Sequence, residues 1–243
     1  AEVSKHLGTE IYFNYVLDDG ASRLRLDHYA GVSNASIADI ATLAMGEGLC
    51  GLAAEQRRPL IVRDTQAASD PALERCRAIG LRFYVGYPLL AQGELLGTLS
   101  FASREARVFG DDDHEFLGTI SHYVAIAKQR ARTLRRLQQR EQELRLITDA
   151  APALISYIDA DLRYRFNNHA YEVWFGRKRE DLYGKHVSEV LGADAAKALR
   201  AYMNQALAGK RVRYEAWLTY RERGRCYVAA DYIPHTDDRG RVL

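Results

Sequence analysis

Residues 82–102, RFYVGYPLLAQGELLGTLSFA, contain the pattern that decides the fold of the first half of the chain. Two apolar runs flank Gln92-Gly93, a dipeptide typical of a turn, so the stretch predicts two strands joined by a tight connection. Both runs carry apolar residues at odd and at even positions. This pattern is typical of strands that are covered on both faces, and it predicts a central place in the sheet.

The first of these strands presents two different faces. Because successive side chains of a strand point to opposite sides, Arg82 and Tyr84 are expected on one face, and Phe83 and Val85 on the other. Arg82 and Tyr84 are therefore our candidates for a ligand pocket in the first domain, although the alternation leaves open which face lines that pocket.

The residues upstream predict alternating strands and helices. Apolar residues alternate over 11–17 and again over 24–28, around the turn Asp18-Asp19-Gly20, which favours a β-hairpin. The other elements expected here are a helix over 34–45 capped by Asn34 or Ser36, a short strand over 59–62, and a helix that begins at Ser69-Asp70-Pro71.

A long helix is expected over 111–150, where acidic residues occupy the first turn and Pro152 follows the end. Apolar or small residues recur along it at intervals of three and four, which predicts a connector that dimerises as a coiled coil. The repeat is irregular near Leu134–Leu137, and at this point two packings of similar energy are expected. This expected seam comprises Leu117, Ile120, Val124, Ala127, Ala131, Leu134, Leu137 and Leu144.

The chain after Pro152 predicts a second region of strands and helices. The expected elements are strands over 154–159 and 164–167, short helices, a longer helix over 194–208, strands over 212–220 and 225–233, and the opening of a further strand at 241–243. The fold class expected for the whole chain is α+β, with two domains that each hold a central antiparallel sheet flanked by helices and that are joined by the long helix.

Composition excludes several classes of protein. The chain has 243 residues, 47% hydrophobic and 27% charged, with a formal net charge of +2, which is typical of a globular protein and gives no excess of positive charge for nucleic acid. The basic run Lys128–Arg140 is interpreted as a solvated helix face. Neither a signal peptide nor an apolar run long enough for a membrane is visible, and three scattered cysteines fit a reducing compartment, so a cytoplasmic location is expected.

Two groups of motifs resemble known families. Pro59–Asp64, the RFYVGYPL run at 82–89 and Leu96-Gly97-Thr98-Leu99 follow one another as in bacterial sensory GAF domains, so residues 1–127 resemble that family. Residues 151–243 resemble a PAS domain, with the last strand incomplete. The residues that carry this second resemblance are Asn167, Ala170, Phe175-Gly176, Leu182, Gly184, Leu191-Gly192, Gly209, Glu215, and Pro234 with Asp237 or Asp238 before Gly240.

The two resemblances imply a sensory input module. The PAS resemblance implies a five-stranded antiparallel sheet cupped by short helices, and the connector looks like the signalling helix of histidine kinases and diguanylate cyclases. The module is expected to bind a small ligand or to relay a signal, as a homodimer without catalysis of its own, to such an output domain. Aromatic residues that could line a pocket of the second domain, or simply fill its core, are Tyr157, Phe166, Trp174, Tyr202 and Trp217.

An enzymatic alternative rests on two cysteines. Cys50 and Cys76 resemble the cysteines of free methionine sulfoxide reductases, which also use a GAF fold, but the acidic residues expected around the substrate are absent here. No signature for haem, flavin or a covalent bilin is present, and no residue spacing indicates a metal site, so the cofactor stays unknown.

Overall fold

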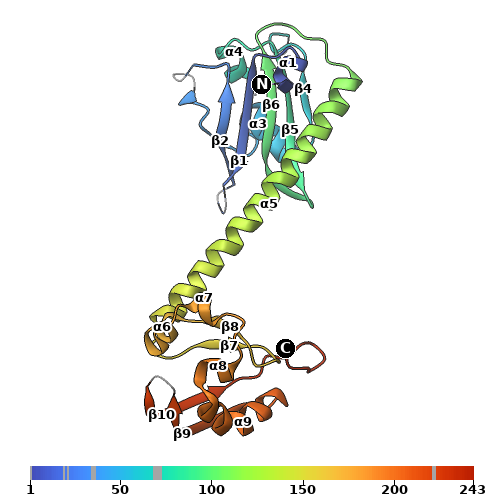
Figure 1. The fold of residues 1–243 in the computed structure, drawn as a ribbon. Helices are drawn as coiled ribbons and strands as arrows, with labels where there is room; N and C mark the ends of the chain where they lie inside the picture. Colours follow the sequence, from blue (N-terminus) through green and yellow to red (C-terminus); the bar gives the residue numbers. More distant parts are fainter. Residues whose placement is uncertain (1, 19, 21, 34–36, 68–72, 221–222) are drawn as a thin grey trace. The chain divides into compact units, whose positions relative to one another are not determined.

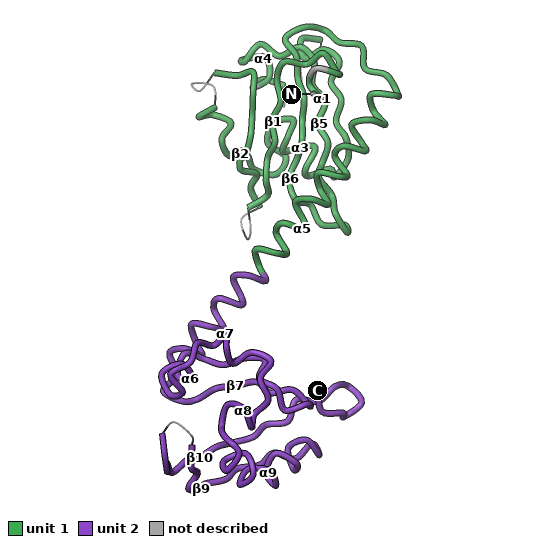
Figure 2. Tube along the Cα trace, viewed as in Figure 1, with its two compact units in different colours: residues 1–136 green, residues 137–243 purple. Residues whose placement is uncertain are grey.

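The computed structural model describes the chain except residues 1, 19, 21, 34–36, 68–72 and 221–222. The chain divides into two compact units, 1–136 and 137–243 (Figure 2). One helix, α5 (Asp111–Ala150), runs from the first unit into the second (Figure 1). The expected mixture of helices with an antiparallel sheet, and the long helix that links two regions, are confirmed. None of the described helices combines the length and the apolar character that a membrane crossing requires.

The first unit is built on a six-stranded sheet with the order β3-β2-β1-β6-β5-β4, in which every neighbouring pair is antiparallel. The expected hairpin at 82–102 forms β5 and β6 and lies inside the sheet, because β6 pairs with both β1 and β5. The strands are β1 (Ile11–Leu17), β2 (Arg23–Ala30), β3 (Thr42–Ala44), β4 (Leu60–Val62), β5 (Phe83–Ala91) and β6 (Glu94–Ser103).

The helix expected over 34–45 is wrong in its second half. Residues 42–44 form β3, in which Leu43 pairs with Leu24 of β2 and is buried against it in the core. Pairing with a strand that lies far away in the sequence has overridden the local helical pattern. The proposed caps Asn34 and Ser36, and the helix start at 69–71, lie outside the described residues.

Helices cover both faces of this sheet. On one face, α3 (Gly48–Gln56) and α4 (Glu74–Ala78) enclose a core that includes Phe13 and Tyr84. On the opposite face, the first half of α5 packs on the odd-numbered residues of β5, and the segment that includes α1 (Glu2–His6) adds Val3 to the same core. The sheet is therefore a single layer shared by two separate cores.

The expected dimer seam is wrong at its beginning. Leu117 is fully buried, and Ile120 and Val124 pack with it against the back face of the sheet, so none of the three belongs to an exposed seam. Two ion pairs hold the same half of α5 on the sheet: Lys128 with Asp27 of β2 at 3.3 Å, and Arg132 with Glu94 of β6 at 2.7 Å.

Most exposed apolar side chains in the second half of α5 lie away from the side that Leu117 occupies. At 3.6 residues per turn, Leu137 and Leu144 fall almost opposite to Leu117 and Leu134 and Ile147 lie at the two edges of this stripe, whereas Leu146 falls on the Leu117 side. Ala127 and Ala131 are exposed at the border between the two sides. The irregularity near Leu134–Leu137 thus marks the point where the apolar side of the helix changes from the sheet-facing side to the open side.

The second unit contains two hairpins and a set of helices. β7 (Ser156–Ile158) pairs with β8 (Tyr164–Asn167), and β9 (Val212–Tyr220) pairs with β10 (Gly224–Tyr232). In the described residues the two hairpins form separate two-stranded sheets, so the expectation of one central five-stranded sheet is not met. The helices are α6 (His169–Phe175), α7 (Arg179–Leu182), α8 (Val187–Leu191) and α9 (Ala193–Leu207).

The core of the second unit lies between α6–α9 and the inner sides of the strands. Leu182, Leu199 and Leu218 are almost completely buried there, together with Tyr164. The expected strand at 241–243 is limited to a single bridge between Thr236 and Val242.

Candidate functional site

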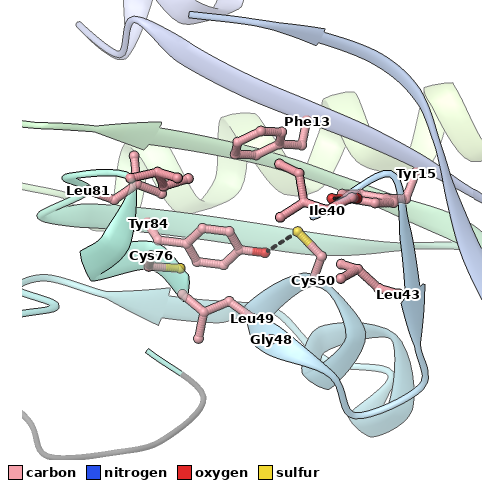
Figure 3. A pocket seen from close by; sticks show the side chains of 11 residues that line it. Phe13, Tyr15, Ile40, Leu43, Gly48, Leu49, Cys50, Cys76, Leu81 and Tyr84 are labelled. Carbon is pink, nitrogen blue, oxygen red and sulfur yellow. Dashed lines mark hydrogen bonds between the residues drawn. The ribbon is translucent and has the colours of Figure 1, made fainter. Parts of the chain in front are cut away.

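The first unit encloses a cavity of about 40 Å³ between the sheet and the helices α3 and α4 (Figure 3). We call it the Cys50 cavity. Its walls are almost entirely apolar, and the polar atoms that reach it come from thiol and phenol groups. The residues that line it are Phe13, Tyr15, Ile40, Leu43, Gly48, Leu49, Cys50, Cys76, Ile79, Leu81 and Tyr84.

Tyr84 occupies much of the space between the sheet and α3. Its hydroxyl donates to Cys50 Sγ at 3.3 Å, and Figure 3 shows the ring lying across the cavity between Cys50 and Cys76. The phenol reaches this place because Gly86, two residues further along β5, has no side chain: a Cβ there would stand 2.7 Å from Tyr84 Cζ. The Tyr-x-Gly spacing in the strand therefore makes room for the ring.

The surroundings of Cys50 and Cys76 make both thiols unreactive. Cys50 lies on α3 next to Ser100, at 3.4 Å from its Oγ, and burial raises the pKa of the Cys50 thiol. Burial also raises the pKa of Cys76, to about 12. Because the thiolate is the nucleophilic form, both groups are inert thiols near neutral pH, and the geometry does not favour the reductase chemistry considered above.

The cavity offers little hydrogen bonding. Its polar side-chain groups are the thiols of Cys50 and Cys76 and the phenols of Tyr15 and Tyr84, and the Tyr15 hydroxyl already donates to the Ile40 backbone oxygen at 2.8 Å. A sulfur atom is a weak acceptor, so the Tyr84 hydroxyl is held only loosely. A small uncharged molecule with at most one or two polar atoms fits this lining, whereas an ionic group would find no counter-charge in it.

Of the two pocket candidates in the first unit, Tyr84 lines the cavity and Arg82 does not. Arg82 precedes the first residue of β5, its side chain is about half exposed, and its guanidinium pairs with Asp64 at 3.0 Å. The prediction for Arg82 is therefore wrong. Alternation assigns a side chain to a face of the sheet, but it does not show where the strand ends and its side chains become exposed to solvent. The pKa of Asp64 is lowered by the backbone N–H of Gln66 and by Arg82.

The aromatic candidates of the second unit are scattered. Tyr157 and Trp217 are exposed, so the prediction that they line an internal pocket is wrong. Trp174 and Tyr202 pack against the core, where Tyr202 stacks on Tyr214 with ring centroids 4.4 Å apart. Phe166 borders a separate surface hollow, which is described below.

A contact that no sequence pattern indicates joins β5 to α5. The Tyr87 hydroxyl lies 2.6 Å from His114 Nδ1 and 3.0 Å from the His114 backbone oxygen. Tyr87 is buried on the back face of β5, and burial raises its pKa to about 12. The strand that carries Tyr84 into the cavity therefore also contacts the first turns of α5.

A second group that sequence reasoning missed holds the end of α5 within the second unit. The Asn168 side chain is fully buried, donates to the backbone oxygens of Thr148 and Ala153 at 2.8 Å, and accepts from Ile155 N–H at 3.0 Å. Asp149 accepts from the backbone N–H of His169 at 2.6 Å. The only sequence signal was that Asn168 directly precedes a helix, where a cap is expected.

Comparison with known proteins fits this architecture. The profile of the GAF domain family matches residues 1–128. The chain belongs to the GAF domain family. The profile of the PAS fold matches residues 148–243, so a GAF domain is followed by a PAS domain. The described residues hold no group of three or more His, Cys, Asp and Glu side chains that could bind a metal ion.

Several solved structures resemble the GAF domain. The GAF domain of an Acinetobacter phosphoenolpyruvate-protein phosphotransferase is 18% identical, with a TM-score of 0.48 over 56% of this chain and 80% of that one. A domain of a putative sensor histidine kinase from Sinorhizobium meliloti is 16% identical, with a TM-score of 0.47 over 56% and 90%. A free methionine-R-sulfoxide reductase from Thermoplasma acidophilum is 22% identical, with a TM-score of 0.46 over 53% and 86%.

We predict that Gly86→Ala lowers the free energy of unfolding of the GAF domain by about 1–3 kcal/mol, because the new methyl group displaces the Tyr84 ring. Gly118→Ala on α5 is the matched control: its Cβ would lie 3.9 Å from Tyr87 Cε1, an ordinary contact, and alanine stabilises a helix by about 1 kcal/mol relative to glycine. Denaturant unfolding measures both. Equal effects of the two substitutions would show that Tyr84 is not held in place over Gly86.

We predict that a thiol reagent at pH 8 modifies Cys226 quickly in the native protein and Cys50 and Cys76 slowly, because both buried thiols are protonated at that pH and only Cys226 is partly exposed. The release of chromophore from the reagent gives the rates, and the same assay in denaturant should count three thiols. Fast modification of Cys50 in the folded protein would instead favour a thiol enzyme.

Proposed function

We propose that the chain is the sensory input module of a bacterial signal-transduction protein, in which the GAF cavity takes a small uncharged molecule and α5 relays its binding. GAF and PAS domains are sensory and regulatory modules, which supports this class of function. The observation that carries the proposal is the position of β5, which presents Tyr84 to the Cys50 cavity and Tyr87 to His114 of α5.

The size of the cavity restricts the ligand. A space of about 40 Å³ admits only a molecule of a few heavy atoms unless Tyr84 moves. A ligand that displaces the Tyr84 hydroxyl from Cys50 would shift β5, and a close-packed interior transmits such a shift to its other face. The residues there that receive it are Val85, Tyr87 and, on α5, Leu117.

The exposed apolar stripe of α5 supports a homodimer through this helix. Leu137 and Leu144 are more than half exposed and stand seven residues apart, the repeat of a two-stranded coiled coil. A second copy of the chain provides an identical stripe, so the two helices would cover each other. The output domain that such a dimer would control is, by analogy with the arrangement of GAF and PAS domains, a histidine kinase or a diguanylate cyclase.

The geometry of the Cys50 cavity does not favour catalysis. The two cysteines that a methionine sulfoxide reductase would need are buried, protonated thiols, and Tyr84 fills the space between them. We therefore assign the GAF cavity to binding rather than to thiol chemistry.

Native mass spectrometry of the protein purified from cells tests the proposal. We predict a mass of twice 27.4 kDa for the chain, and a monomer for Leu137→Asp, because the charge would be buried in the helix pair. Leu146→Asp is the control, since Leu146 is also exposed, at 73% against 58% for Leu137, but lies on the opposite side of α5. A monomeric chain, or a Leu137→Asp variant that stays dimeric, would contradict the relay.

The same spectra report on the cavity. A bound small mass, or an absorption band beyond that of the aromatic residues, supports a ligand, and we expect it to be lost in Leu49→Phe, which fills the cavity from α3. If the dimer carries no additional mass and no small molecule of a screened library stabilises it, the chain is a dimerisation module that senses no ligand.

A further inference from the structure

A second site lies in the PAS domain, outside its core and within the unit 137–243. It is a surface hollow of about 340 Å³, bounded by the C-terminal part of α5, by β8 and by α7, which lie next to one another in Figure 1. We call it the Arg145 hollow. Its lining residues are Arg145, Arg165, Phe166, Asn167, Arg179, Glu180 and Tyr183.

The charge of the hollow favours an anion. Three guanidinium groups and one carboxylate, that of Glu180, line it. Arg145 donates from Nη2 to Glu141 at 2.9 Å, and Arg165 donates from Nε to Asp159 at 2.6 Å. Because a guanidinium carries five N–H donors in a planar fork, these pairs leave donors on both residues for a phosphate or a carboxylate.

Among the described residues, Arg179 has two carboxylate partners, whereas Arg145 and Arg165 have one each. It pairs with Asp149 at 3.4 Å and with Glu172 at 3.5 Å, and the backbone N–H of Arg179 together with His169 lowers the pKa of Glu172 to about 2. Arg179 therefore connects the end of α5 to α6 and α7, and its charge forms the rear of the hollow.

Asn167 provides an independent sign of a ligand. It is the last residue of β8 and only 4% exposed, and its Oδ1 has no hydrogen-bond partner among the described residues. A buried acceptor without a donor is unfavourable, and a donor on a molecule in the hollow would remove that cost.

Aromatic side chains form the remaining wall. Phe166 is half-buried, and the Tyr183 ring lies under Arg165, whose Cζ is 5.7 Å from the ring centroid. These groups provide flat apolar surface next to the charged one, as in sites that bind small organic anions.

We propose that the Arg145 hollow binds a small molecule that carries a phosphate or a carboxylate together with a hydrogen-bond donor. The anionic group lies between Arg145 and Arg165, and the donor faces Asn167 Oδ1. Because Arg145 belongs to α5 while Asn167 and Arg165 belong to β8, the bound molecule fastens the end of the connecting helix to the PAS domain. This site is separate from the Cys50 cavity and does not depend on it.

Inorganic phosphate is the probe, because it combines an oxyanion with a P–O–H donor, whereas sulfate at neutral pH offers the same oxyanion without a donor. Thermal unfolding of the whole chain is followed by tryptophan fluorescence, since both tryptophans, Trp174 and Trp217, lie in the second unit. At constant ionic strength we expect phosphate to raise the midpoint saturably, and sulfate to raise it less.

Three variants locate the effect. Arg145→Gln should weaken the apparent phosphate affinity at least about tenfold, as expected for a lost charged hydrogen bond. Asn167→Leu should raise the midpoint in the absence of phosphate, because it removes the unpartnered oxygen, and should abolish the difference between phosphate and sulfate. Arg200→Gln, on the exposed side of α9, is the control and should behave as the wild type.

Two results would overturn the proposal. Equal effects of phosphate and sulfate in every variant would mean an adventitious ion only. An Asn167→Leu protein that still distinguishes the two anions would place the site elsewhere. If that variant fails to fold, Asn167→Asp replaces it, since its carboxylate should repel both anions; unchanged phosphate binding by Asn167→Asp would contradict the site equally.

Discussion

The structure of the GAF domain depends on the fact that β5 is covered on both sides. Its even-numbered residues include Tyr84, which enters the Cys50 cavity, and its odd-numbered residues, from Phe83 to Leu89, are buried under α5. One strand thus forms part of the wall of the cavity and the platform on which the connecting helix rests. In the proposed relay, a ligand that displaces the strand acts on α5, because a close-packed interior leaves little empty space behind the strand.

The connecting helix is fixed at each end by a different kind of interaction. In the GAF domain, burial of Leu117 and the ion pairs of Lys128 and Arg132 hold it on the sheet. In the PAS domain, Asn168 and Asp149 hold its last turn by hydrogen bonds to the start of α6. Between these anchors the helix presents its exposed apolar stripe, and this is the part that we propose meets a second copy of the chain.

Much of the fold could be predicted from local pattern. The hairpin at 82–102 and the long helix are evident because apolar residues on both sides of a strand, or three and four residues apart, have few other interpretations. Thr42–Ala44 could not be recognised as a strand, because its partner Leu24 is remote in the sequence. The helical pattern identified Leu117 as apolar, but it could not say that the sheet, and not a second helix, covers it.

The candidate site was predictable only in part, for similar reasons. Tyr84 packs in a different core from Phe83 and Val85, as alternation predicts. Alternation could not show that Arg82, which precedes the strand, is an exposed residue paired with Asp64. The roles of Asn168 and of the Tyr87–His114 contact depend on which backbone groups come near them after folding. Contacts between residues that are distant in the sequence produce no periodic pattern in it.

In the proposed relay, the Cys50 cavity and α5 are coupled through β5. Xenon probes this coupling, because it enters dry apolar cavities without chemistry of its own. Backbone amide NMR spectra recorded under increasing xenon pressure measure the response. We expect saturable shifts at Cys50 and Tyr84, and also at His114 and Gly118 on the other side of the sheet. Shifts confined to the residues that line the cavity would contradict the coupling.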